Sequence, residues 1–190
     1  MDRPLSKAHL AYLEAFNATR RMGRDVSKMA GMKDPVREAV GLPVGEDGCF
    51  FVGGGSGEHT EDVIDFNHCP SGQPSLWCPW APNVDGTEIL EDGSEKAYGY
   101  VEWIEYLVTC FLEPWGYKLN GEVSWSGEDS DDRGTIYVKD NVVEGVPDVI
   151  SNPGPSWLGE EEKLEKLKAA LPLKDVEEEI ADDVMGEEED

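Results

Sequence analysis

The clearest pattern of apolar and polar residues lies between Glu95 and Glu113. Polar residues recur there at steps of three or four, at positions 95, 99, 102, 106, 109 and 113, and nearly all other positions are apolar. A narrow polar stripe with a period of 3.6 residues predicts an α-helix that is largely buried. Pro114 and Gly116 predict the end of this helix.

Strict alternation follows directly after the helix. Tyr117, Leu119, Val123 and Trp125 alternate with polar residues, which predicts a strand with one buried face. A loop at 127–134, a returning strand at 135–140, a turn at Asp140-Asn141 and a last strand at 142–143 complete an antiparallel sheet. We therefore expect an α+β fold with N-terminal helices, a central buried helix packed on a small antiparallel sheet and an acidic C-terminal tail.

The N-terminal part reads as two helices. Ser6 is a suitable N-cap for an amphipathic helix over 6–29. Asp34 and Gly41 bracket a short second helix over Pro35–Val40. The first helix carries a basic cluster near its end, at Arg20, Arg21, Arg24 and Lys28. We interpret this cluster as a solvated face, with docking on acidic residues of this or another chain as the alternative.

Residues 45–91 contain short elements between breaks. A glycine-rich segment over 45–57 encloses the apolar run Cys49–Val52, but it lacks the lysine and the spacing of a phosphate-binding loop. We expect a short strand at 63–66, a Trp-anchored loop or edge strand over 67–82, and a returning strand at 87–91 after the turn Asp85-Gly86.

Composition divides the chain into four parts. These are an N-terminal helical segment (1–44), an α+β core domain (45–146), a linker rich in Pro, Gly, Ser and Asn (147–159), and a short helix with an acidic tail (160–190). The tail beyond residue 175 is too acidic to bury enough apolar surface to fold alone.

The net charge of −25 is extreme for 190 residues. Residues 1–40 carry +3, residues 41–155 carry −18 and residues 156–190 carry −10. The apolar central block must therefore fold with eighteen excess carboxylates on its surface. Such a charge disfavours direct binding of nucleic acid or membranes.

No catalytic site emerges from the motifs. The residues that invite a metal site are Cys49, His59, His68, Cys69 and Cys78, but their spacing fits neither a structural zinc site nor a zinc deaminase. The acidic loop at 128–132 does not match a calcium-binding loop. We therefore predict no catalytic residue, no metal and no cofactor. Four cysteines without a signal peptide or long apolar run indicate a cytoplasmic protein with reduced thiols.

Charge itself remains as the functional feature. Duplex DNA presents about one phosphate charge per 1.7 Å of axis, and a folded acidic surface can imitate that row of charges toward Lys- and Arg-lined channels. Adaptation to high salt is the competing explanation. The predicted partner-binding residues are Glu95, Glu102, Glu105, Glu113, Glu122, Glu128, Asp129, Asp131 and Asp132.

Four segments carry a resemblance to known sequences. They are PSGQPSLWC (70–78), YVEWIEYL (100–107), PWGYKLNGEVSWSGED (114–129) and GTIYVKDNVV (134–143). Together they resemble an uncharacterised domain of phage and mobile-element proteins, for which no activity is known. The resemblance covers about half of the chain and implies a phage or mobile-element context, in which small acidic proteins often inhibit host nucleic-acid enzymes.

The sequence thus favours a non-enzymatic, acidic binding protein. We expect an inhibitor of a basic host protein, such as a defence nuclease or another nucleic-acid enzyme, acting as a DNA mimic in the host cytoplasm. The alternatives are a phage structural or assembly protein, and a metal-dependent enzyme with a site in 49–78. Formation of a homo-oligomer is left open.

Overall fold

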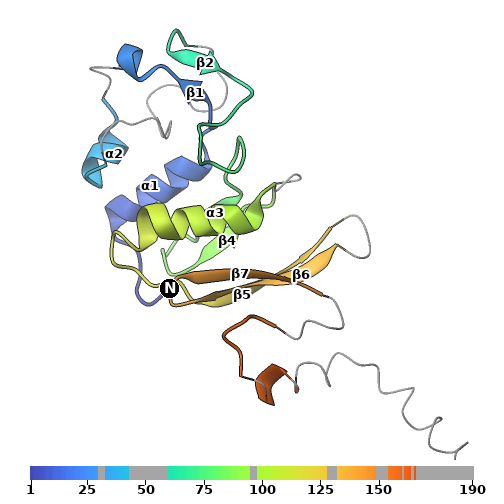
Figure 1. Cartoon of the computed structure of the whole chain (residues 1–190). Helices are drawn as coiled ribbons and strands as arrows, with labels where there is room; N and C mark the ends of the chain where they lie inside the picture. The colour runs from blue at the N-terminus through green and yellow to red at the C-terminus, as the bar shows by residue number, and fades with distance from the viewer. Residues whose placement is uncertain are drawn as a thin grey trace, which may run out of the picture. The chain divides into compact units, whose positions relative to one another are not determined.

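The computed structural model describes residues 1–29, 33–42, 60–94, 98–127, 132–148, 154–159, 161–163 and 165. It is an α+β fold of short helices and small antiparallel sheets, as predicted (Figure 1). The chain forms two compact units. The first comprises Met1–Glu122 and Val138–Val143, and the second comprises Val123–Tyr137 and Glu144–Asp190. None of the described helices is both long and apolar enough to cross a membrane.

Helix α1 (Lys7–Asn17) begins as predicted, because the Ser6 side chain accepts a hydrogen bond from the backbone N–H of His9. It ends at Asn17, so the prediction of a helix reaching residue 29 was wrong. The guanidinium of Arg21 folds back and donates hydrogen bonds to the carbonyls of Phe16 and Thr19. It thereby satisfies acceptors at the helix end that a further turn would have used.

The basic cluster after α1 is solvated only in part, because Lys28 is exposed whereas the side chains of Arg21 and Arg24 are buried. Arg21 is fully buried, and the Arg24 guanidinium lies 2.6 Å from the Asp62 carboxylate, with 5% and 3% of the two side chains exposed. This pair joins strand β1 (Gly23–Arg24) to the segment of strand β2 (Val63–Asp65), with which β1 pairs in antiparallel fashion. Docking on an acidic residue of the same chain, the alternative interpretation, holds for Arg24.

Two further short helices flank this region. A 3-10 helix, η1 (Val26–Met29), follows β1. Helix α2 (Pro35–Ala39) confirms its prediction, because the Asp34 carboxylate accepts hydrogen bonds from two backbone N–H groups of its first turn. Gly41 takes a left-handed φ of +73° just beyond its end. The predicted break at 45–57 and the run Cys49–Val52 lie outside the described residues.

The predicted hairpin around Asp85-Gly86 is present. Strands β3 (Trp80–Pro82) and β4 (Ile89–Glu91) pair in antiparallel register, and Gly86 adopts φ +65° in the turn. Trp80 anchors the preceding loop, since its buried indole donates to the Tyr100 carbonyl over 2.8 Å.

The central helix begins later than predicted. Helix α3 (Tyr100–Leu107) continues into a π-helical segment, η2 (Val108–Leu112). Gly99 adopts φ +65°, which is incompatible with a right-handed helix and sets the start at Tyr100; residues 95–97 are not described. The predicted end is confirmed by the turn after Glu113, where Gly116 has φ +76°.

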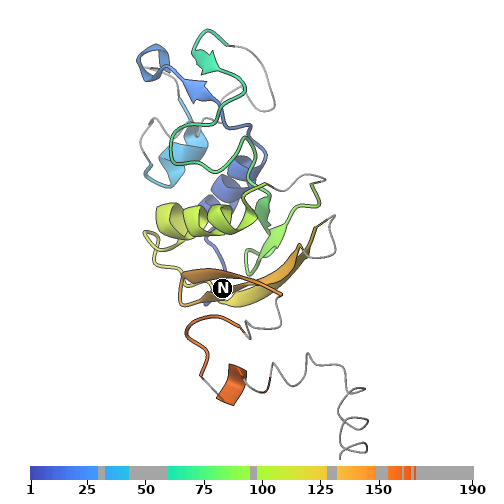
Figure 2. The ribbon, with the colours of Figure 1, turned by 45° about the vertical axis from the view of Figure 1, so that its right-hand side comes forward.

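The core of the first unit is aromatic. Helices α1 and α3 lie side by side (Figures 1 and 2). Aromatic rings of α1 meet rings of α3 and of η2. The Phe16 and Phe111 centroids are 5.0 Å apart, and those of Tyr12 and Phe111 are 5.1 Å apart in an edge-on arrangement. Both α1 and α3 also contact β3, so the helices pack on the β3–β4 sheet. The segment predicted as a separate N-terminal part thus contributes directly to this core.

A three-stranded sheet has the order β5 (Gly121–Ser126), β6 (Arg133–Lys139), β7 (Val142–Pro147). The Asp140-Asn141 turn is confirmed, with φ of +48° and +72° at its two residues, as in the tight turns that favour hairpins. Residues 117–120 are not a strand, although Tyr117 and Leu119 are buried as predicted. The inward placement of Val123 was wrong, because this residue of a terminal strand is 40% exposed.

The C-terminal part is described only in places. Residues 161–163 and 165 are helical, in agreement with the predicted short helix, and the acidic tail beyond residue 165 lies outside the described residues. The predicted boundaries at residues 44, 146 and 159 stay predictions.

His9 gives the fold a pH dependence near neutrality. Its ring stacks on Trp115 with centroids 4.1 Å apart, and its Nδ1 lies 2.9 Å from the Tyr117 hydroxyl. That hydroxyl accepts from the Ser6 N–H and can donate its own proton to a neutral imidazole. Burial, followed by the nearby Arg3 charge, lowers the pKa of His9.

The free energy of unfolding is therefore expected to fall as the pH drops from about 7 to about 5. The unfolded chain, with a His pKa of about 6.5, binds the proton more tightly than the folded chain, so this contribution is present above that value and is lost below it. Urea unfolding at several pH values should show that the free energy of unfolding depends less steeply on pH in His9→Gln than in the unmodified chain. An equal pH dependence of the free energy of unfolding in H9Q and in the unmodified chain would contradict the role of His9.

Candidate functional site

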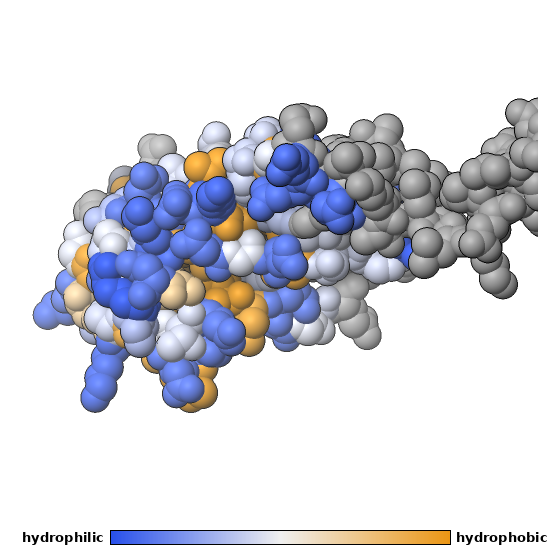
Figure 3. Space-filling view, turned by 90° about the horizontal axis from the view of Figure 1, so that it is seen from below, coloured by the Kyte–Doolittle hydropathy of each residue, from blue (hydrophilic) through white to orange (hydrophobic). Residues whose placement is uncertain are grey.

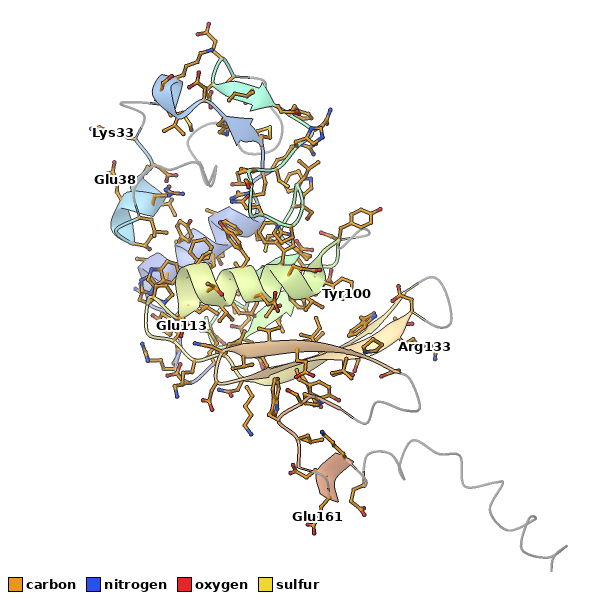
Figure 4. The ribbon with its side chains drawn as sticks, viewed as in Figure 1. Lys33, Glu38, Tyr100, Glu113, Arg133 and Glu161 are labelled. Atoms are coloured by element: carbon orange, nitrogen blue, oxygen red, sulfur yellow. The ribbon has the colours of Figure 1, made fainter. Side chains whose placement is uncertain are left out.

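The outer side of the central helix is an exposed acidic surface. Glu102, Glu105, Thr109 and Glu113 are all exposed and recur at steps of three or four residues, so they follow one side of the helix. We call Glu102, Glu105 and Glu113 the acidic face. Figure 4 labels Glu113 near one end of this helix and Tyr100 at the other. Tyr106, which the sequence pattern placed in the polar stripe, is only partly exposed and stacks with Phe16.

The opposite side of the helix holds the acidic face in place. Trp103, Ile104 and Leu107 are buried, and the Trp103 indole donates to the Ser75 hydroxyl over 2.8 Å. The π-helical segment is closed by a hydrogen bond from the Glu113 N–H to the Val108 carbonyl, 2.9 Å long. Carboxylates on a helix that is fixed in this way bind a partner without first ordering their own backbone.

No cation neutralises these glutamates within the part of the chain that the structure describes. Ion pairs in that part of the chain join Arg3 to Asp2, Arg24 to Asp62, His68 to Asp65 and Lys118 to Asp140, and none of these four involves the acidic face. The acidic face is thus open to cations of a binding partner. In Figure 3, hydrophilic residues cover much of the coloured surface and surround smaller apolar areas, which fits a protein of this composition.

Of the other six predicted binding residues, two are described by the structure and four are not. Glu122 is exposed at the start of β5 in the first unit. Asp132 is exposed in the second unit, where its carboxylate accepts a hydrogen bond from the Trp125 indole over 3.1 Å. The remaining four, Glu95, Glu128, Asp129 and Asp131, lie outside the described residues.

The alternative of a metal site in 49–78 rests on residues that the structure covers only in part. Cys49 and His59 are not described. The Cys69 thiol donates to the Gln73 carbonyl over 3.1 Å, the Cys78 thiol is 3.6 Å from the Trp80 carbonyl, and His68 pairs with Asp65 over 2.8 Å. No group of three or more His, Cys, Asp or Glu side chains with metal-binding geometry occurs among the residues placed by the structure.

Sequence reasoning missed one exposed cluster in the first unit. The Arg20 guanidinium lies over the Phe66 ring, 4.2 Å from its centroid, and 5.9 Å from the centroid of Trp77, whose side chain is 39% exposed. These residues come from distant parts of the chain, and no periodicity links them. The pairing of β1 with β2 brings Arg20 to Phe66, and a hydrogen bond of 2.7 Å from the Arg21 N–H to the Leu76 carbonyl brings it to Trp77.

Comparison with known proteins gives no further assignment. No family model matches the chain, and no curated protein or solved structure matches it.

Proposed function

We propose that this chain is a non-enzymatic protein that binds a basic partner through the acidic face of its central helix. The partner carries Lys and Arg on a surface that normally holds nucleic acid, such as that of a host nuclease. Occupation of that surface would exclude nucleic acid, because both ligands use the same cations.

The supporting observation is the placement of charge. Glu102, Glu105 and Glu113 are exposed and form no ion pair within the described chain, while three of the eight cations of residues 1–40 are withdrawn from solvent. The withdrawn residues are Arg21, Arg24 and Arg37, whose side chains are buried. The Asp34 and Asp62 carboxylates are buried as well, so burial removes little net charge and the surface stays strongly negative, which favours electrostatic attraction of a basic protein.

The same arrangement supports the context of an inhibitor. An enzyme needs a convergent set of reactive groups, whereas the acidic face consists of side chains of one type along one helix. Together with the resemblance to phage and mobile-element sequences, it supports an anti-defence protein in the host cytoplasm that acts as a DNA mimic.

Capture of partners by the immobilised chain tests this proposal. We expect basic nucleic-acid-binding proteins to be retained from a host lysate at about 50 mM salt and released at about 500 mM, because screening shortens the reach of exposed charges. The variant E102Q/E105Q/E113Q should retain at least about tenfold less, if each exposed charge contributes about 0.5 kcal/mol.

A matched control separates the acidic face from net charge. The variant E14Q/E38Q/E91Q also loses three exposed carboxylates, but from α1, α2 and β4. It should retain the partners nearly as well as the unmodified chain. Equal losses in the two variants would show that charge acts without a defined site and would contradict the proposal.

A further inference from the structure

Strand β5 lies at the end of its sheet. In the order β5-β6-β7, β6 is the only described strand that pairs with it. The Gly127 N–H donates to the Asp132 carbonyl over 2.6 Å, which sets the register of the β5–β6 hairpin. Ser124 and Thr135, whose hydroxyls are 3.3 Å apart, keep that register, because each lies three residues from the closing pair. The hairpin therefore contains no bulge between these two pairs.

This register fixes which backbone groups of β5 are free. In an antiparallel ladder the residues of one strand alternate between bonding to the neighbour and pointing away from it. Since Gly127 bonds to β6, Trp125 and Val123 also direct their N–H and C=O groups to β6. Ser124 and Ser126 direct theirs to the outer edge, where no described strand pairs with them.

Within the part of the chain that the structure describes, this edge is also exposed to solvent. Glu122, Val123, Ser124 and Ser126 are all exposed, so neither face of this strand is covered along most of its length. Strand edges in monomeric proteins are normally blocked by proline, lysine or a bulge. β5 contains neither proline nor lysine, and it has no bulge between Ser124 and Gly127, whereas β7 ends in Pro147 and its Glu144 carboxylate accepts hydrogen bonds from the Ser156 N–H and hydroxyl.

We infer that the outer edge of β5 is a docking site for an extended, Lys- or Arg-bearing segment of the partner, which adds to the sheet as a fourth strand. Backbone hydrogen bonds to Ser124 and Ser126 would hold the segment, as in other cases of strand addition. Its cations would meet the exposed carboxylate of Glu122, which shares one face of β5 with Ser124 and Ser126.

Charge favours this occupant over a second copy of the chain. β5 contains one carboxylate and no cation, and two copies would each bring a net charge of −25 to the contact. The inference rests on the proposed function for the sign of the partner's charge, but it concerns a different element from the acidic face.

Residue-resolved amide exchange of the full chain tests the edge directly. The probe is a short peptide of alternating lysine and valine, with alternating serine–valine and glutamate–valine peptides as controls. Saturation with the lysine peptide should slow exchange at Ser124 and Ser126 about tenfold, which corresponds to one new hydrogen bond at each amide. Val123 and Trp125, already bonded to β6, should change little.

Three results would overturn the inference. The first is unchanged exchange at Ser124 and Ser126 with the lysine peptide. The second is equal protection by the serine or glutamate peptide, which would remove the charge preference. The third is protection of both serines in the free chain that grows with protein concentration, because a second copy would then occupy the edge.

A pair of variants provides an independent check. Ser124→Pro removes the outward N–H without removing a bond to β6, and Ser124→Ala keeps that N–H. The affinity for the lysine peptide should fall about tenfold or more in S124P and stay within about twofold in S124A. Should S124P not fold, as seen by circular dichroism, the exchange pattern of the unmodified chain still decides the question.

The variant E102Q/E105Q/E113Q separates this inference from the proposed function. In this variant the lysine peptide should still slow amide exchange at Ser124 and Ser126 but not at Val123 and Trp125, since the three substituted side chains belong to another element. Loss of partner capture in this variant, without protection of Ser124 and Ser126 in the unmodified chain, would keep the proposed function and overturn only the edge. Protection at the edge with unaltered capture in the variant would overturn the acidic face and keep the edge.

Discussion

Replacement of Asp62 by alanine is expected to lower the free energy of unfolding by about 3 kcal/mol, because it leaves a buried guanidinium without its carboxylate. The Arg24 and Asp62 side chains are only 5% and 3% exposed, with 2.6 Å between Nη1 and Oδ2. A separate backbone hydrogen bond, from the Asp25 N–H to the Asp62 carbonyl over 2.7 Å, joins the same two segments and is retained in this variant. Urea unfolding followed by circular dichroism measures the change.

Two controls define the origin of that loss. Arg24→Met combined with Asp62→Leu removes both charges and should recover most of the stability, as replacement of a whole buried ion pair by apolar side chains often does. Ser27→Ala, in the same region but at an exposed residue, should cost much less. If D62A lowers the free energy of unfolding by less than about 0.5 kcal/mol, this ion pair contributes no more than an exposed one, which would contradict the prediction.

The same ion pair should give acid sensitivity. Burial by itself would raise the pKa of Asp62, but hydrogen bonds from Thr60 and Arg24 outweigh burial and hold that pKa below its ordinary value. The folded chain therefore binds this proton less tightly than the unfolded chain. The stabilisation is present above the unfolded pKa of about 3.9 and is lost as the pH falls through the folded value. The unfolding free energy of D62A should vary less with pH in this acidic range.

Replacement of Gly134 by alanine is expected to destabilise the chain by about 3 kcal/mol through overpacking. A Cβ atom at this position would overlap the Trp125 ring and the Val146 carbonyl oxygen, all within the second unit. The ring covers the glycine from the opposite position on β5, an arrangement that stabilises glycine in a strand. Ser126→Ala, at an exposed residue of β5, is the matched control and should change stability by less than about 0.5 kcal/mol.

The Trp125 indole reports on the mechanism of this loss. Its N–H donates to the Asp132 carboxylate over 3.1 Å, and displacement of the ring in G134A should break that bond. The indole proton resonance should shift in G134A and stay in place in S126A. Unchanged stability together with an unshifted indole signal would refute the proposed collision.

The parts of the fold that were predicted correctly depend on local signals. Asp34 before Pro35 specifies α2, Asp85-Gly86 specifies a turn, and Pro114 with Gly116 ends the central helix. Each of these acts through its own backbone geometry or through neighbours a few residues away. The stripe that contains Glu102 and Glu113 was predictable for the same reason, since helical spacing alone determines which residues share a side.

The incorrect predictions involve contacts between distant segments. The end of α1 depends on the burial of Arg21, and the pairing of β1 with β2 brings together residues about forty positions apart. The exposure of Val123 follows from the terminal position of β5 in its sheet, which no alternation pattern reveals. The free edge of β5 is made of backbone groups, so no residue type announces it.

The salt dependence of partner binding tests the central claim most directly. For a captured nucleic-acid enzyme, fluorescence anisotropy can follow displacement of a labelled DNA duplex by the chain at a series of salt concentrations. The unmodified chain should displace the duplex at low salt, and E102Q/E105Q/E113Q should bind more weakly and with a shallower dependence of log affinity on log salt than E14Q/E38Q/E91Q. Identical affinities and slopes for the two triple variants, or binding without displacement of DNA, would contradict the assignment of the acidic face as the binding site.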